Sequence, residues 1–200
     1  MEASHPSSLS HGKTHVFRVV KTCKTIARAM NDHGAREIDM EVLLAAAYFH
    51  DLGRLERIAG LPDVDPPRDM PHAKRSVAFA IALLQQSGDF PVAKIGAVER
   101  AIVSHSFSGG LTPPNVEARI LSDADKLDAM GATGILRTIA FSVERGRSLE
   151  DTVAHLTGKI VVLGKHLVTG PAKALAERKE DVVKRFLQDL LGSNDRHANG

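Results

Sequence analysis

The sequence contains no tryptophan and only one cysteine, Cys23, among its 200 residues. A single cysteine cannot form an intrachain disulfide, which excludes a small disulfide-stabilised scaffold and favours a reducing compartment, the cytoplasm. Aromatic residues make up only 4% of the chain, so the core must be packed from aliphatic side chains. Cys23 lies among helix-forming residues, and we expect it to be an ordinary packed thiol.

A long apolar segment and a strong charge of one sign are also missing. No apolar run approaches the ~20 residues of a transmembrane helix, and residues 1–13 lack the apolar centre of a signal peptide. The formal net charge is +2, without a dense basic or basic-aromatic stretch. We therefore expect neither a membrane nor a nucleic acid as partner. A small anionic substrate fits this charge, and a homo-oligomer stays open.

The chain does contain 43% hydrophobic residues, enough for one sizeable core, and they recur with the period of α-helices. We expect an all-α fold: a single helical bundle of about six to eight helices over residues 13–192, after a flexible arm at residues 1–12. Asp39 is suited to cap the second helix. The expected helices cover residues 14–30, 40–53, 72–87, 91–105, 116–130, 133–145, 149–166 and 172–192.

Two irregular segments interrupt these helices. Residues 59–71 read AGLPDVDPPRDMP, whose four prolines and three aspartates are incompatible with a regular helix. Residues 107–115, FSGGLTPPN, contain paired glycines and paired prolines. We interpret the first segment as a surface loop or a lid and the second as a loop.

Histidines and aspartates gather at the predicted helix ends, next to such loops. A bundle that brings these ends together would form a pocket lined by imidazoles and carboxylates. These groups together bind divalent first-row metal ions and leave coordination positions open for water and substrate. The residues concerned are His15, His50, Asp51, His72, His105 and Asp125.

The adjacent pair His50-Asp51 needs a local explanation. Neighbouring side chains in a helix point about 100° apart, so two adjacent ligands normally cannot share one metal ion. At a helix C-terminus, however, the second residue can leave helical geometry and turn inward. Gly53, two residues further on, allows the chain to turn there.

These residues resemble the H…HD…D signature of HD-domain metal-dependent phosphohydrolases, which are all-α. The resemblance extends from about residue 14 to at least residue 145. It is most similar to a bacterial branch of small HD nucleotide hydrolases, which combine a histidine in an HSF-like stretch with a D-A-D-[KR]-L-D-A segment. This chain has SHSF at 104–107 and DADKLDAMGATGILRT at 123–138.

The resemblance implies a set of site residues. The metal ligands would be His15, His50, Asp51 and Asp125, with Asp125 rather than Asp123 as the fourth ligand because it is the aspartate of ADKL. Asp128, one helical turn further on, could support the ligands. The resemblance implies that His72 and His105 act as general acid or base, contact phosphate or bind a second metal ion. Arg54, where many HD phosphodiesterases have a lysine, could contact a phosphate oxygen, and Lys126 and Arg137 are further candidates for phosphate contacts.

Each of these residues also has an ordinary interpretation. His105 could be a hydrogen-bonded core histidine, His72 a surface residue at a helix start, and Arg54 a solvated arginine. Lys126 and Arg137 could be partners in structural ion pairs.

The resemblance implies a metal-dependent hydrolase of nucleotides, converting nucleoside triphosphates to monophosphates and pyrophosphate. Mn²⁺ is the metal we expect first, with Fe²⁺, Co²⁺, Ni²⁺, Mg²⁺ and Zn²⁺ as alternatives. Other phosphoesterases stay open: a 5′-nucleotidase, and a phosphodiesterase of cyclic nucleotides or guanosine tetraphosphate. A non-catalytic nucleotide-binding HD module is the alternative from another class.

Overall fold

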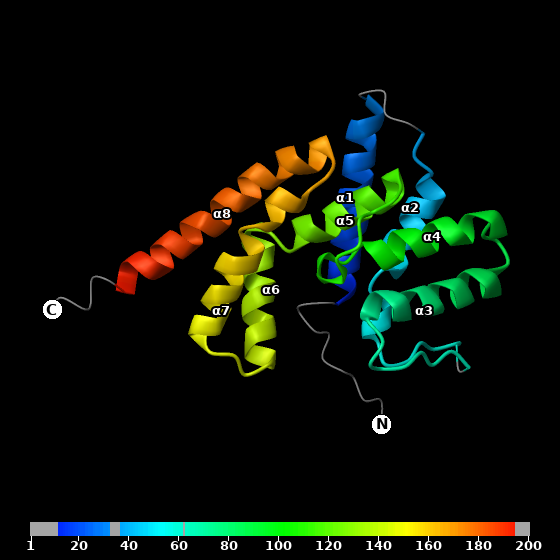
Figure 1. The fold of residues 1–200 in the computed structure, drawn as a ribbon, viewed down its shortest axis with the longest axis horizontal. Helices are drawn as coiled ribbons and strands as arrows, with labels where there is room; N and C mark the ends of the chain where they lie inside the picture. Colours follow the sequence, from blue (N-terminus) through cyan, green and yellow to red (C-terminus); the bar gives the residue numbers. More distant parts are fainter. Residues whose placement is uncertain (1–11, 33–36, 62, 195–200) are drawn as a thin grey trace. The chain divides into compact units, whose positions relative to one another are not determined.

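The computed structural model describes residues 12–32, 37–61 and 63–194, and within these ranges the chain forms α-helices and no strand. The expected all-α class is therefore confirmed (Figure 1). The predicted flexible arm falls almost wholly on residues 1–11, outside the described residues. The α-helices are α1 (Lys13–Asp32), α2 (Met40–Phe49), α3 (His72–Ser87), α4 (Val92–Ser104), α5 (Val116–Asp128), α6 (Gly131–Glu144), α7 (Leu149–His155) and α8 (Gly170–Asn194).

The chain divides into two compact units, with the boundary after Asp125. The first unit contains α1 to α4 and most of α5; α2 packs against α1, α3 and α4, and α3 packs along α4. Its core is aliphatic, as the scarcity of aromatic residues predicts, with Phe79 as a fully buried exception. Cys23 is fully buried, and burial, followed by the nearby Asp125 carboxylate, raises the pKa of its thiol. The thiol therefore stays protonated and packed.

Helix α2 is capped by Asp39, as the sequence predicts. The Asp39 Oδ1 atom accepts hydrogen bonds from the backbone N–H groups of Glu41 and Val42, at 3.1 and 3.2 Å. Two apolar pairs, Val42-Leu43 and Ala46-Ala47, are buried on this helix. The cap and the buried residues together fix where α2 begins and ends, and the helix delivers His50 to the interior.

The second unit contains α6, α7 and α8, with α6 packed against α7 and α8. The sequence predicts one helix over 149–166, and this prediction is wrong. Helix α7 ends at His155, and a π-helical turn (Leu156–Ile160) and a 3₁₀ turn (Leu163–His166) follow. A Cβ atom at Gly164, in this 3₁₀ turn, would collide with the side chain of Glu180, so the turn lies close against α8.

The segment 59–71 contains no helix among its described residues, as expected. None of the described helices is both long enough and apolar enough to span a bilayer. A single domain over residues 13–192 stays a prediction.

Candidate metal centre

The His50-Asp51 pair lies where α2 stops being a helix. His50 keeps helical backbone angles, with φ −56° and ψ −33°, whereas Asp51 has φ −108° and ψ 9°. A 3₁₀ turn, Leu52–Arg54, follows directly. Because Asp51 leaves helical geometry, His50 Nε2 and Asp51 Oδ2 come within 3.9 Å of each other, as the sequence argument requires.

Gly53 serves a different purpose from the one that the sequence suggests. Its φ is not positive, so the turn itself does not require glycine. A Cβ atom at Gly53 would instead collide with the backbone oxygen of His72 and lie 2.6 Å from the backbone nitrogen of Ser76. Glycine is therefore needed because α3 approaches the turn so closely.

Two residues of α3 hold this turn, and sequence reasoning missed both. Ser76 Oγ accepts a hydrogen bond from the Gly53 N–H at 2.8 Å. The Arg75 guanidinium donates to the carbonyl oxygens of Gly53 and Leu55, at 2.6 and 3.1 Å. Ser76 is fully buried in the apolar stripe of α3, which also contains Ala73. The sequence signal that could have identified Ser76 is a polar residue within the apolar stripe of a helix.

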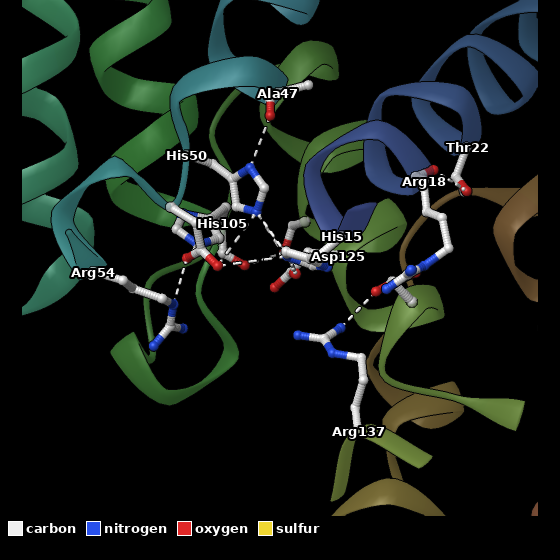
Figure 2. Close-up of polar contacts among 12 residues, drawn as sticks. His15, Arg18, Thr22, Ala47, His50, Arg54, His105, Asp125 and Arg137 are labelled. Atoms are coloured by element: carbon white, nitrogen blue, oxygen red, sulfur yellow. Dashed lines mark hydrogen bonds and ion pairs between the residues drawn. The ribbon is translucent and has the colours of Figure 1, made fainter. Parts of the chain in front are cut away.

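Four donor atoms converge beside this turn. His15 Nε2 lies 3.2 Å from His50 Nε2, 3.5 Å from Asp51 Oδ2 and 3.4 Å from Asp125 Oδ1. His50 Nε2 is 3.9 Å from both carboxylate oxygens. Figure 2 shows His15, His50 and Asp125 pointing toward one another, with His105 beside His50. The structure thus brings together all four residues of the predicted metal set.

The tautomers of two imidazoles are fixed by backbone carbonyls. His50 Nδ1 lies 2.8 Å from the carbonyl oxygen of Ala47, and His105 Nδ1 lies 2.5 Å from that of Ile102. A carbonyl oxygen can only accept, so in each ring Nδ1 carries the hydrogen. In the neutral ring Nε2 then presents a lone pair, which is the form that binds metal ions.

Helix α5 is tied to the end of α4 next to the same group of donors. Ser122 Oγ donates a hydrogen bond to the His105 carbonyl oxygen at 3.0 Å. Three residues further along α5, Asp125 faces the histidines with 27% of its side chain exposed. This bond links α5 to the end of α4 beside the donors.

The charges of the site favour a bound cation. Burial opposes ionisation of Asp125, but the nearby His50, His105 and His15 outweigh it and lower the pKa of this carboxyl. Burial, followed by the field of His50, lowers the pKa of His105 to about 4. At neutral pH the Asp125 carboxylate is therefore ionised and the His105 imidazole is neutral.

The donor spacing fits a first-row divalent ion. Ligands bound at about 2.1 Å lie about 3.0 Å apart at a right angle and about 4.2 Å apart when opposite. The five donor distances given above, from 3.2 to 3.9 Å, all fall in this interval. The ligand atoms of His15, His50 and Asp125 all lie within 4.8 Å of one another, as do those of His50, Asp51 and His105.

Arg54 and His72 lie on the other side of Asp51. Arg54 Nε contacts Asp51 Oδ1 at 2.8 Å, and Arg54 Nη2 lies 3.3 Å from His72 Nε2. Arg54 is thus neither a fully solvated arginine nor an isolated phosphate contact. His72 begins α3, and its Nε2 atom is 3.6 Å from Asp51 Oδ1. Figure 2 shows Arg54 reaching toward this part of the site.

The remaining predicted residues lie from Lys126 onward. Lys126 is buried, with 6% exposure, and its side chain leaves α5 about 100° away from that of Asp125. Arg137 Nη1 forms an ion pair with Asp128 Oδ2 at 2.5 Å, within the second unit. This contact supports the interpretation of Arg137 as a partner in a structural ion pair. A phosphate-binding role of Lys126 stays a prediction.

Most of the site residues lie within a region that matches a known protein family. Residues 12–130 match the sequence model of the HD domain, a range that covers more than half of the chain. The uncharacterized protein YpgQ of Bacillus subtilis (strain 168) is 33% identical over 82 residues, which are 39% of this chain and 40% of YpgQ. In this alignment the chain spans about two fifths of the curated relative.

Solved structures match over longer stretches. Bacillus subtilis YpgQ in complex with ADP has a TM-score of 0.68 at 25% identity, over 94% of this chain and 91% of that chain. A predicted HD superfamily hydrolase from an uncultured Thermotogales bacterium has a TM-score of 0.58 at 27% identity, over 92% and 81%. A Lactobacillus plantarum protein has a TM-score of 0.72 over 95% and 90%; at 23% identity, this likeness shows the fold alone.

Proposed function

The chain belongs to the HD-domain family, and from this premise we propose that it is a metal-dependent phosphohydrolase that acts on nucleotides. The proposed reaction is hydrolysis of a nucleoside triphosphate to a monophosphate and pyrophosphate. The observation that carries the proposal is the convergence of two imidazole nitrogens and two carboxylates at distances that suit one ion. The four residues, His15, His50, Asp51 and Asp125, all lie within the matched region.

The donor set suits the chemistry of phosphate-ester and anhydride cleavage. Mixed nitrogen and oxygen donors accommodate Mn²⁺, our first proposal, as well as Fe²⁺, Co²⁺, Ni²⁺, Mg²⁺ or Zn²⁺. When bound, a divalent cation supplies Lewis-acid polarisation of the phosphoryl group and lowers the pKa of water. The protein's own contribution is to hold the donors in place through buried helix ends.

The two further histidines are suited to different tasks. His105 has a pKa of about 4, far below neutrality, so at pH 7 its ring is neutral with a free Nε2 lone pair but is a weak proton acceptor. His72 is more accessible, with 25% of its side chain exposed. We assign proton transfer to His72 and positioning to His105. Arg54, 36% exposed, can direct guanidinium N–H groups toward a phosphate oxygen.

The nucleotide part of the proposal has a separate basis. YpgQ, which is 25% identical to this chain over nearly its whole length, has been crystallised with ADP. The segment SHSF and the segment beginning DADKLDA, both present here, resemble those of small HD nucleotide hydrolases. The mild positive charge of the chain is compatible with such an anion.

A second candidate is a phosphodiesterase that uses two metal ions. The observation that favours it is the second group of potential ligands, formed by His50, Asp51 and His105. Two-metal sites hold both the attacking and the leaving oxygen. The number of ions bound per chain separates the two candidates.

The test is a screen of nucleotides with Mn²⁺-loaded protein, in which phosphate and pyrophosphate are assayed separately. We expect pyrophosphate from nucleoside triphosphates. Asp51→Asn, which keeps the size of the side chain, should lower kcat by several orders of magnitude, equivalent to several kcal/mol of transition-state stabilisation. His50→Ala should also be inactive.

The thermal unfolding of each variant in metal-free buffer provides the control for folding. Release of inorganic phosphate from monophosphates would replace the proposal with a 5′-nucleotidase. A folded, metal-loaded protein that releases neither product would instead favour a non-catalytic nucleotide-binding module.

A further inference from the structure

The two oxygens of Asp51 face different partners. Oδ2 lies 3.5 Å from His15 Nε2 and 3.9 Å from His50 Nε2, on the side of the four-donor group. Oδ1 faces Arg54, His72 and His105, with distances of 2.8 Å, 3.6 Å and 3.9 Å to their nearest nitrogens. A carboxylate oriented in this way can bind one cation with each oxygen, and two-metal hydrolytic sites place their ions about 3.5–4 Å apart.

The donors on the Oδ1 side would suit a second metal ion by their chemistry. The rings of His72 and His105 lie side by side, with their centroids 5.5 Å apart. The Nδ1 atom of His105 is hydrogen-bonded to a backbone carbonyl, so Nε2 presents its lone pair toward Asp51. Two imidazoles and one carboxylate oxygen are a sufficient start for a metal site.

A guanidinium group already occupies this side of Asp51. Arg54 contacts two of the three donors, Asp51 Oδ1 through Nε and His72 Nε2 through Nη2. Arginine stays protonated at every pH that a protein tolerates, so its positive charge is permanent. A second metal ion would have to displace both contacts and approach this charge.

We propose that Arg54 takes the place of a second cation and limits the centre to one bound metal ion. This inference rests on the proposed function, because it concerns the same centre. The guanidinium neutralises Asp51 through an ion pair, as a second ion would, and its planar group also contacts His72 through a hydrogen bond. Because Arg54 occupies the place of a second ion, the centre binds one metal ion, unlike a two-metal phosphodiesterase. Unlike a metal ion, the guanidinium offers no coordination position for water.

The test measures bound metal in the resting protein, without substrate. Wild-type protein and Arg54→Met are equilibrated with excess Mn²⁺, desalted and analysed for metal per chain. We expect one ion in the wild type and two in Arg54→Met. Methionine keeps a long unbranched side chain and removes the positive charge. Electron paramagnetic resonance of the variant should show two coupled Mn²⁺ ions, because both would share the Asp51 carboxylate.

Three further variants isolate the cause. Arg54→Lys keeps a positive charge and should stay at one ion. Arg68→Met removes an arginine whose side chain is 67% exposed and which pairs with Glu56 at 3.3 Å; it should also stay at one ion. Arg54→Met combined with His72→Ala removes a donor of the second site and should return the count from two to one.

Each result decides for or against the inference. Two ions in the wild type, or one ion in Arg54→Met, overturns it. Loss of all metal from Arg54→Met also overturns it, because Arg54 would then hold Asp51 in place for the first ion. If the metal counts are as expected and no nucleotide is hydrolysed, the proposed reaction fails while the inference about Arg54 stands.

Discussion

Asp123 and Asp125 lie two residues apart on α5, yet their side chains have different surroundings. Asp125 faces the histidines, with Oδ1 3.4 Å from His15 Nε2 and 3.9 Å from His50 Nε2. Asp123 is completely buried, and its side chain leaves the helix about 200° around the axis from that of Asp125. Asp123 is thus not a solvated side chain, and the geometry supports Asp125 as the ligand.

At the scale of these two residues, a pair of isosteric variants separates metal binding from packing. We expect Asp125→Asn to lose most of its bound Mn²⁺ while keeping the melting temperature of the metal-free protein. Asp123→Asn should keep its metal and lower the free energy of unfolding by about 1–3 kcal/mol, because it alters a fully buried polar group. Metal analysis and thermal unfolding measure the two effects. Full metal retention in Asp125→Asn with loss in Asp123→Asn would reverse the assignment.

At the scale of elements, the start of α2 depends on one capping residue. Asp39 caps the helix and also forms an ion pair with Lys94 at 2.8 Å. The hydrogen bond from Lys94 is the main cause that lowers the pKa of Asp39 below 3.8, against a smaller opposing effect of burial. The carboxylate form is therefore favoured in the folded protein, and the cap is complete at neutral pH.

We expect Asp39→Ala to lower the free energy of unfolding by about 1 kcal/mol at neutral pH, the usual cost of a lost cap. Because the folded state lowers this pKa, the contribution is present above pH 3.8 and is lost as the pH falls below that value. The difference between wild type and variant should therefore shrink near about pH 3. Denaturant unfolding at both pH values measures it, and Asp39→Asn, a neutral cap, should restore most of the loss. A difference that is unchanged at low pH would contradict the role of the charge.

The close packing of the Leu52–Arg54 turn on α3 also belongs to this scale. We expect Gly53→Ala to cost about 1–3 kcal/mol, because the added methyl group forces the backbone of α3 and the turn apart. Asp51 precedes the turn directly, so the affinity for Mn²⁺ should fall as well. Denaturant unfolding and metal titration measure both effects.

Gly96→Ala is a matched control in the same unit. Gly96 lies inside α4, where a Cβ atom would meet only the side chain of Arg100 at 3.4 Å. Alanine should stabilise this helix by up to about 1 kcal/mol and leave metal affinity unchanged. Gly53→Ala with wild-type stability and affinity would show that the turn can relax away from α3.

At the scale of the whole molecule, one ion would connect residues distant in the sequence. His15 comes from α1, His50 and Asp51 from the end of α2, and Asp125 from α5. A ligand that binds only the folded protein stabilises it by about 4 kcal/mol at a thousandfold excess over Kd. We therefore expect Mn²⁺ to raise the melting temperature and a chelator to reverse the rise. Asp51→Asn should show a much smaller shift; an equal shift would place the ion elsewhere.

The sequence predicts the fold and the position of the centre from features that are local. Asp39 marks a helix start, His72 follows Pro71 at another, and the apolar period of each segment gives its length. The order of His15, His50, Asp51 and Asp125 identifies residues that meet only in the folded chain. This prediction depended more on the resemblance to HD enzymes than on the helical period of apolar residues.

The sequence fails where contacts between elements decide the outcome. Residues 149–166 have helix-forming character, but the α-helix ends at His155, and two irregular turns follow that pack against α8. Gly53 suggests a flexible turn, whereas the reason for glycine lies in α3. The hydrogen bonds from Arg75 to the carbonyl oxygens of Gly53 and Leu55 depend on which face of α3 meets the turn. The spacing of residues along the chain does not show which face this is.

The hydrogen bonds from His50 and His105 to the carbonyls of Ala47 and Ile102 have a consequence for how the centre withstands genetic change. In each case the acceptor belongs to the main chain, three residues earlier in the same helix. A point mutation at position 47 or 102 replaces a methyl or a butyl group and leaves the acceptor oxygen in place. The orientation of both rings is thus inherited with the helices themselves and does not depend on which side chain occupies the two supporting positions, although both positions are buried in the core.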